Sequence, residues 1–287
     1  MTAGLLLLLL LMPTAGPDGK PELPPPGAWE SAYPEGVVNL LRNPGFEEPN
    51  AAGDGPVHWQ GIDGLVYHWT VDPSAPQRGK VLKINTDVSQ GQAYRWWIER
   101  YVRGAALDAA PRREPTREPK YDTIAGLDGG FFWSDPIEVK EGGAYRVYVD
   151  ARGPGAKVFL RGYVAEPVVS FGDEQPAVQE LFRAPRGEPT HDAKGRPIKY
   201  RMRYRYTTWF SVGGSDEWKT YSHRAPRHPN NRELTEDVRW VRVMLYPYWP
   251  PGEYWFDNVR VVETDPAENA GVPEGEEADF EEGKIVR

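Results

Sequence analysis

The chain has 287 residues, a hydrophobic content of 39% and a formal net charge of −8, so it is long enough for one large β domain or two small ones. Most of that charge lies in the stretch from Glu263 onward, where nine acidic residues face only Lys284 and Arg287, and the rest of the chain is close to neutral. This balance excludes the broad basic field of a nucleic-acid binder, and the absence of cysteine excludes disulfides, thiolate metal sites and cysteine nucleophiles.

The first residues predict export. An apolar run at 5–12 is too short to cross a bilayer and is followed by the small residues Thr14, Ala15 and Gly16, which is typical of a signal peptide over residues 1–16. The basic residues that usually precede such a run are missing, so a misassigned start or a leader without function stays open. Residues 17–36 are rich in proline and predict an extended linker. We therefore expect a secreted, periplasmic or cell-surface protein without a transmembrane anchor.

One domain is predicted over residues 37–264, built from short strands. Asn43-Pro44-Gly45 is a strong turn signal, because proline fixes φ and glycine accepts positive φ. Alternating apolar residues and turn breakers predict further strands in chain order at 57–60, 65–71, 80–86, 130–139, 145–152, 157–164, 200–212, 218–224, 238–246 and 253–263.

The remaining segments are less regular. Residues 92–102 fit either a strand or a helix by their aromatic spacing, and we favour a strand. Long polar, proline-rich segments at 103–128 and 167–197 are predicted insertions, the second with a hint of a short helix at 178–182. Residues 265–287 form an acidic tail that we expect to be flexible.

The last predicted strand contains a charged residue at an unexpected place. Strict alternation puts Asp257 on the same face as Val259 and Val261, which points it toward the core. An inward carboxylate is costly unless it is paired, hydrogen-bonded or bound to a metal. Asp257 therefore needs a partner.

The two ends of the domain resemble a known group. N-L-L-R-N-P-G-F-E near the start and Y-W-F-D-N-V-R-V near the end look like the carbohydrate-binding modules of families four, nine, sixteen and twenty-two, which are galactose-binding-like jelly-roll β-sandwiches. The resemblance implies an all-β jelly roll, here with two long insertions, whose first and last strands lie together and share a structural calcium ion. Glu47 and Asp257 match the acidic ligand positions, and backbone carbonyls would supply other ligands, since calcium takes six to eight oxygens. The alternative is that Asp257 caps a turn or pairs with an arginine.

The aromatic content predicts a sugar-binding surface. With 11 Trp, 15 Tyr and 9 Phe, the chain has more rings than one core needs, and prolines around 247–251 stiffen a loop that can hold rings outward. In 200–212, strict alternation puts Arg201, Arg203 and Arg205 on one face with Trp209. These arginines are expected to pair with neighbouring carboxylates, and the alternative is that they receive an acidic sugar beside Trp209. The predicted ligand-binding residues are Trp97, Trp133, Arg203, Arg205, Trp209, Tyr248 and Trp249.

These patterns favour an exported, noncatalytic protein that binds a polysaccharide or glycan, and no nucleic acid. A structural or protein-interaction sandwich without a sugar site is the alternative. Signatures of zinc proteases and of serine hydrolases are absent from the sequence. A weaker enzyme hypothesis is a jelly-roll polysaccharide lyase using Tyr221, His223 and Arg224, of which the first two share a face of one predicted strand.

Overall fold

The computed structural model describes residues 37–104, 124–125, 129–168, 181–225 and 237–265. The predicted signal peptide, the proline-rich linker, nearly all of the acidic tail and parts of both insertions, including most of the predicted helix at 178–182, lie outside these residues. Within them, no helix is long and apolar enough to span a membrane.

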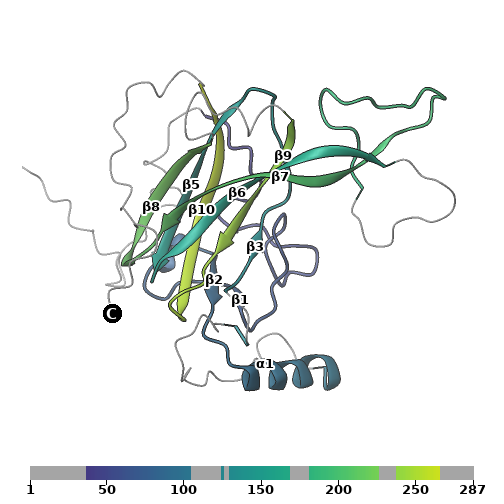
Figure 1. Cartoon of the computed structure of the whole chain (residues 1–287). Helices are drawn as coiled ribbons and strands as arrows, with labels where there is room; N and C mark the ends of the chain where they lie inside the picture. Colours follow the sequence, from purple (N-terminus) through teal and green to yellow (C-terminus); the bar gives the residue numbers. More distant parts are fainter. Residues whose placement is uncertain (1–36, 105–123, 126–128, 169–180, 226–236, 266–287) are drawn as a thin grey trace, which may run out of the picture.

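Two antiparallel sheets make up the domain (Figure 1). In spatial order, the first sheet contains β1 (Tyr67–Thr70), β2 (Val81–Asn85), β10 (Glu253–Thr264), β5 (Ala144–Gly153) and β8 (Ser215–Ala225). The second sheet contains β3 (Phe132–Trp133), β9 (Val238–Tyr246), β6 (Ala156–Val168) and β7 (Lys199–Val212), with β4 (Ile137–Glu138) also paired to β9. The predicted all-β sandwich is confirmed.

The core lies between the two sheets. Val147 and Val149 of β5 are completely buried, as are Val158 of β6 and Val243 of β9, and their intervening neighbours face outward. Fully burying one such side chain contributes about 1.5–3 kcal/mol. The alternation that predicted these strands therefore also identifies the core residues.

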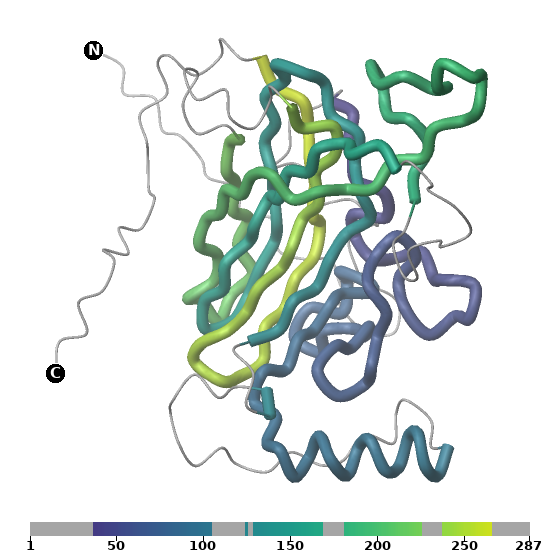
Figure 2. Tube along the Cα trace, turned by 45° about the vertical axis from the view of Figure 1, so that its right-hand side comes forward, coloured from purple at the N-terminus to yellow at the C-terminus, as the bar shows by residue number. Residues whose placement is uncertain are grey.

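The beginning and the end of the domain lie side by side, as the resemblance implied. Leu40 donates its backbone N–H to the carbonyl of Val261 (2.8 Å), and the Val261 N–H donates to Oδ1 of Asn39 (3.0 Å). Further along, the Val259 N–H donates to the carbonyl of Pro44 (2.9 Å). The tube in Figure 2 shows β10 in yellow passing through the middle of the molecule, where it is flanked by other strands.

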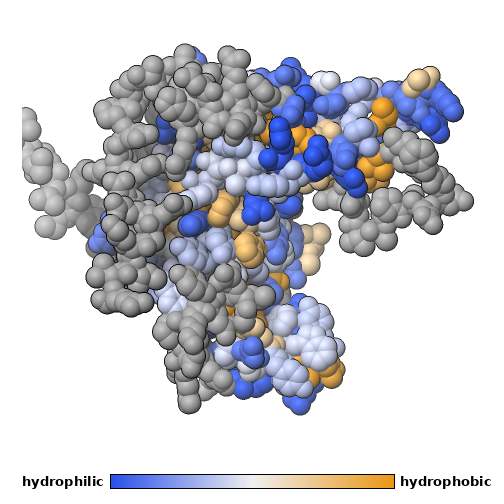
Figure 3. Space-filling view, in the orientation of Figure 1, coloured by the Kyte–Doolittle hydropathy of each residue, from blue (hydrophilic) through white to orange (hydrophobic). Residues whose placement is uncertain are grey.

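Residues 92–102 form a helix, so the prediction of a strand was wrong. Helix α1 (Gln90–Trp97) continues into a π-helical turn at Ile98–Val102 and lies below the sheets (Figures 1 and 2). Its start is a capping box, in which the Ser89 hydroxyl accepts from the Gln92 N–H and the Gln92 side chain accepts from the Ser89 N–H. This pattern satisfies two helix-start N–H groups and was readable in the sequence. The exposed surface of α1, at the bottom of Figure 3, mixes pale and orange side chains with blue ones.

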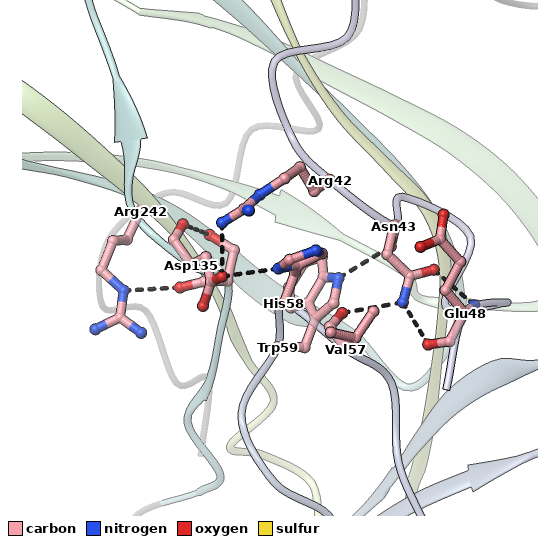
Figure 4. A network of polar contacts seen from close by, with 9 residues as sticks. Arg42, Asn43, Glu48, Val57, His58, Trp59, Asp135 and Arg242 are labelled. Carbon is pink, nitrogen blue, oxygen red and sulfur yellow. Dashed lines mark hydrogen bonds and ion pairs between the residues drawn. The ribbon is translucent and has the colours of Figure 1, made fainter. Parts of the chain in front are cut away.

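The turn after the first segment is organised by Asn43 (Figure 4). Its side-chain amide donates to the carbonyls of Glu48 (2.9 Å) and Val57 (3.0 Å), and its own carbonyl accepts from Nε1 of the buried Trp59 (3.0 Å). Asn43 has φ 50°, a left-handed conformation that asparagine tolerates better than most residues. The predicted turn is confirmed, and these bonds attach it to the sandwich.

Strands β6 and β7 are longer than the sandwich needs. They pair from Ala156 opposite Val212 to Val168 opposite Lys199, and their distal part projects from the sandwich as a two-stranded arm (Figure 1). Phe182 extends the pairing through reciprocal backbone bonds with Tyr200 (2.7 and 3.0 Å). Part of the second predicted insertion is therefore continuous with the sheet.

Candidate functional site

A row of aromatic rings crosses the outward face of the second sheet. Tyr246 stacks between Phe131 and Tyr248, with ring centroids 4.7 and 5.3 Å away and interplanar angles of 11° and 13°. Phe159 lies 5.8 Å from Tyr246 and 6.4 Å from Trp209. We call Phe131, Phe159, Trp209, Tyr246 and Tyr248 the aromatic row. Trp209 and Phe131, at two of its ends, are 36% and 42% exposed, so solvent reaches both rings.

Alternation along the strands explains why these rings share a face. Phe159 stands between Val158 and Leu160, which belong to the core, and Trp209 precedes the core residue Phe210. Successive side chains of a strand point to opposite faces, so burying one set presents the other to solvent. Because Phe159 is directly opposite Trp209, the row runs across neighbouring strands.

Cations accompany the rings. Lys157 places its ammonium 4.2 Å from the centroid of Trp209 and 5.5 Å from that of Tyr248. The guanidinium carbons of Arg161 and Arg242 lie 5.2 and 5.3 Å from the ring centre of Trp133, which is next to the row. Ammonium and guanidinium groups are attracted to the ring faces, and each such contact contributes about 0.5–1 kcal/mol at an exposed site.

The structure brings together three of the predicted ligand-binding residues, Trp133, Trp209 and Tyr248. The loop carrying Tyr248 is held by residues before β3: the Gly130 N–H donates to the Pro247 carbonyl (2.9 Å), and a Cβ on Gly129 would overlap the backbone of residues 247 and 248. Trp249 follows in the same loop and is half-buried. The stiff loop predicted from its prolines therefore presents Tyr248 as part of the row.

Arg203 and Arg205 occupy a different place from the one that alternation predicted. A bulge lies between Gly162 and Tyr163 of β6, and on β7 it leaves Arg205 without an opposite residue. As a result Tyr204, 6.2 Å from Tyr163, is on the outward face with Trp209, and Arg203 belongs to the opposite face. Arg205 forms an exposed ion pair with Asp237 (3.6 Å). The predicted arginine face beside Trp209 was wrong, because one extra residue reverses the alternation.

Trp97 is separate from the row. It belongs to α1 and is 50% exposed, and the helix projects below the sheets (Figure 1). Trp97 was predicted to bind ligand from a strand at 92–102, and its place on α1 separates it from Trp209.

A second bulge decides the direction of Asp257. Between Asp257 and Arg260 the pairing of β10 with β5 shifts, and Asn258 has φ 48°. The core therefore receives Tyr254, Phe256 and Val259, whereas Asp257 points to the other face of the first sheet. The predicted inward direction of Asp257 was wrong, although the residue is buried, with 1% exposure.

The partner of Asp257 is an arginine. Nη1 of Arg78 donates to Oδ2 of Asp150 (2.8 Å) and to Oδ2 of Asp257 (3.0 Å). Arg78 ends a short 3₁₀ turn (Pro76–Arg78) that covers this face, and its guanidinium lies 4.3 Å from the ring centre of Trp218. Asp150 also accepts from the Thr220 hydroxyl (2.6 Å). The arginine pairing that the sequence left open is thus present.

The cluster of Arg78, Asp150 and Asp257 has one more negative charge than positive when both carboxyl groups are ionised. Burial raises the pKa of Asp257 to about 7, and the Asp150 carboxylate raises it too, against the lowering by Arg78 and by the Asn258 N–H. Two buried carboxylates against one guanidinium leave one charge uncompensated, which favours a bound proton.

Glu47 contacts Gly79 and Lys80, the two residues that follow Arg78. Its Oε1 accepts the Lys80 N–H (2.9 Å), and its carboxylate lies where a Cβ of Gly79 would stand. A Cβ on Gly45 would be 3.7 Å from Oδ1 of Asp257 and 3.9 Å from Cγ of Glu47, so the two predicted ligands lie near each other.

These contacts do not fit a calcium ion in the observed arrangement. Oδ1 of Asp257 accepts the Asn258 N–H (2.8 Å), Oδ2 accepts Arg78, and Oε1 of Glu47 is engaged with Lys80. No group of three or more His, Cys, Asp or Glu side chains able to hold a metal occurs among the residues that the structure describes. Calcium needs six to eight oxygens, so Arg78 would have to leave Asp257 before an ion could bind.

Two residues of the lyase hypothesis, Tyr221 and His223, face inward. His223 is 6% exposed, stacks on Phe210 (5.1 Å) and contacts the Thr208 hydroxyl through Nε2 (3.1 Å). The Tyr221 hydroxyl donates to the Gly213 carbonyl (2.9 Å), and burial raises its pKa. A base for proton abstraction must reach its substrate, and neither group does so from this position.

Sequence reasoning missed several residues of the face. Phe131, Phe159 and Tyr246 complete the row, and Arg161 and Arg242 flank Trp133. The signal was present in K-V-F-L-R at 157–161, where Lys157, Phe159 and Arg161 alternate with core residues. Alternation alone does not tell which outward face is covered, so this pattern does not by itself identify a binding face.

The chain was compared with known proteins. No protein-family model matches it, and a search of curated proteins gives no significant match.

Among solved structures, it is similar to a family 61 carbohydrate-binding module in complex with β-1,4-galactotriose, at 12% identity and a TM-score of 0.35 over 79% of this chain and 99% of that one. It is also similar to a family 22 xylan-binding domain from Paenibacillus barcinonensis, at 9% identity and a TM-score of 0.33 over 80% and 97%. A third match is an arabinose-bound α-L-arabinofuranosidase, at 12% identity and a TM-score of 0.37, over 81% of this chain but only 27% of that one. The family 22 module is of the type that the terminal motifs resemble. At these identities and TM-scores the likeness carries no argument about ligand or chemistry, and the fold assignment rests on the two sheets.

Proposed function

We propose that this protein is an exported, noncatalytic polysaccharide-binding protein whose binding surface is the outward face of the second sheet. The observation that carries the proposal is the aromatic row, five rings in continuous contact on the solvent side of a sheet. Rings on this face do not contribute to the sandwich core.

The chemistry of the row suits a sugar. The C–H groups of a pyranose pack against aromatic faces, and its hydroxyls need hydrogen-bonding groups beside them. Lys157 and Arg161 supply donors next to the rings. Because Tyr246, Phe131 and Tyr248 are stacked on one another, they lose little conformational freedom when a ligand binds.

The experiment is a binding panel with three single variants. Affinity electrophoresis and calorimetry would measure binding of the wild type to soluble plant and bacterial polysaccharides. We expect Trp209→Ala and Tyr248→Ala each to weaken binding by about tenfold, since truncating an aromatic anchor costs about 1–2 kcal/mol or more.

The matched control is Trp97→Ala, which removes an exposed ring of the same kind from α1. It should leave the affinity unchanged, with circular dichroism confirming that all variants fold. Absence of binding across the panel, or an equal loss in the control, would overturn the proposal and favour a sandwich without a sugar site.

The structural calcium ion is a separate proposal that rests on the sequence resemblance. Its support is that Glu47 and Asp257 lie near each other beside the loop at Gly79 and Lys80. Thermal unfolding in EDTA and in millimolar calcium tests it: a rise in Tm with calcium that Glu47→Gln abolishes supports the ion. An unchanged Tm would refute it and leave Arg78 as the counter-ion of Asp257.

A further inference from the structure

The second sheet holds two arginines directly opposite each other on its outward face. Arg161 of β6 is paired in register with Arg242 of β9, and both guanidinium carbons lie within 5.3 Å of the ring centre of Trp133. Like charges directly opposite on neighbouring strands are destabilising. This pair of arginines therefore lowers the stability of the sheet at this place.

No carboxylate among the described residues forms an ion pair with either arginine. Arg242 donates through Nε to the Ser134 carbonyl (2.7 Å), and the nearby Asp135 is engaged by Arg42 (2.9 Å) and His58 (3.0 Å) instead (Figure 4). Arg201, on the opposite face of the same hairpin, does have a partner in Glu166. Arg161 and Arg242 thus differ from the ordinary arginines of the same sheet.

Polar atoms beside this pair lack hydrogen bonds. Nε of Arg161 is buried with no hydrogen-bond partner within the described part of the chain, and the same is true of Oγ1 of Thr207. Thr207 is the residue opposite Arg161 on β7, so both atoms belong to one place on the sheet. A buried donor without a partner costs about 1–3 kcal/mol, so this place on the sheet carries a second local cost.

We propose that the polysaccharide is anionic and that its uronic acid carboxylates bind at Arg161 and Arg242. A guanidinium matches a carboxylate with two parallel N–H···O bonds, and rings of the aromatic row are adjacent for the sugar itself. Lys157, beside Trp209 and Tyr248, extends the positive charge along the row. This inference rests on the proposed function and adds the class of ligand.

A general polyanion such as DNA is less suited to this face. Outside the acidic stretch from Glu263 onward the chain is close to neutral, so the domain has no broad basic field to attract a nucleic acid, and recognition of an anion must come from local contacts. In a polymer that contains uronic acids, each uronic acid carries one carboxylate on an otherwise neutral sugar ring. This arrangement matches a surface on which arginines stand among aromatic residues.

The test compares one polymer in two forms. Polygalacturonate or a glucuronate-substituted xylan, and the same polymer after its carboxyl groups have been reduced to alcohols, are titrated into the protein by calorimetry, with single-stranded DNA as a third ligand. We expect the acidic form to bind about tenfold or more tightly than the reduced form, because charge-assisted bonds are stronger than neutral ones.

Arg161→Met should abolish this preference, so that the variant binds the acidic and the reduced polymer with equal affinity. Arg161→Lys, which retains the charge but not the fork geometry, should keep part of it. The matched control is Arg146→Met on the first sheet, where Nη1 of Arg146 lies 3.4 Å from Oγ of Ser222. This variant loses the same charge and should keep the full preference for the acidic polymer.

The outcomes separate the two proposals. Equal binding of both polymer forms, or a preference that survives in Arg161→Met, overturns the anionic ligand but leaves polysaccharide binding in place. Binding of neither form overturns both. DNA binding as tight as that of the acidic polymer would show nonspecific attraction and overturn the uronate assignment.

Discussion

Replacing Asp257 by asparagine should change how stability depends on pH. Asp257 is 1% exposed and stands opposite Asp150 on β5, with a single guanidinium, that of Arg78, between them. Its pKa is raised from 3.8 to about 7, first by burial. The folded protein therefore binds a proton here over a pH range in which the unfolded chain does not.

The direction of the pH dependence follows from the linkage between proton binding and folding. An acid whose pKa is higher in the folded state contributes stability that is complete below its unfolded pKa, near 3.8, and is lost as the pH rises through about 7. Below pH 7, each pH unit changes the free energy of unfolding by about 1.4 kcal/mol. Between pH 5 and pH 8 the free energy of unfolding of the wild type should therefore fall by about 2–3 kcal/mol relative to that of Asp257→Asn.

The assay is urea unfolding followed by tryptophan fluorescence at pH 5, 6, 7 and 8, with EDTA present so that metal binding does not contribute. The variant serves as the reference because other groups titrate in the same range: burial lowers the pKa of His68, which acts in the opposite direction. The free-energy difference between the two proteins isolates Asp257.

A difference that is flat from pH 5 to pH 8 would refute this reasoning. It would mean that Arg78 keeps Asp257 ionised in the folded protein and that burial does not dominate. Asp150→Asn gives a second check, since one carboxylate facing Arg78 should titrate lower and shift the loss of stability to lower pH.

Three further substitutions test single features of the fold. Arg78→Met should cost about 3–5 kcal/mol in urea unfolding, because it leaves buried carboxylates without their cation, and a change under 1 kcal/mol would contradict this. Gly79→Ala should lower the unfolding free energy by about 1–3 kcal/mol, since φ is +73° and a Cβ would meet the Glu47 carboxylate; an unchanged Tm would show that the loop adapts. Ser89→Ala should destabilise α1 by about 1 kcal/mol, seen as faster amide exchange in α1 alone, and equal acceleration in the sheets would disprove a local role.

Local patterns in the sequence were enough to predict most of the strands. Residues 238–246 were predicted as a strand with the same limits that β9 has, and 200–212 differs from β7 only at Lys199. Period-two alternation and turn residues act over a few positions, so they are legible without knowing the fold. The association of the chain ends also followed from two short motifs.

The faces of residues near the bulges differ from those predicted by alternation. One unpaired residue at Arg205 and one irregularity after Asp257 reversed the predicted faces of Arg203 and of Asp257 itself. Bulges depend on how two strands distant in sequence match in length and twist, and alternation within one strand does not contain that information.

The sequence by itself determined the sandwich class and most of the strands, because these follow from local periodicity. It also showed that Asp257 needs a partner, because burying a charge is costly, although it pointed the side chain to the wrong face of the sheet. Only the tertiary structure decided that the partner is Arg78, 179 positions away, and that rings from four segments of the chain form one row. Both depend on strand pairing between segments far apart in the chain, and that pairing is a property of the assembled sheets.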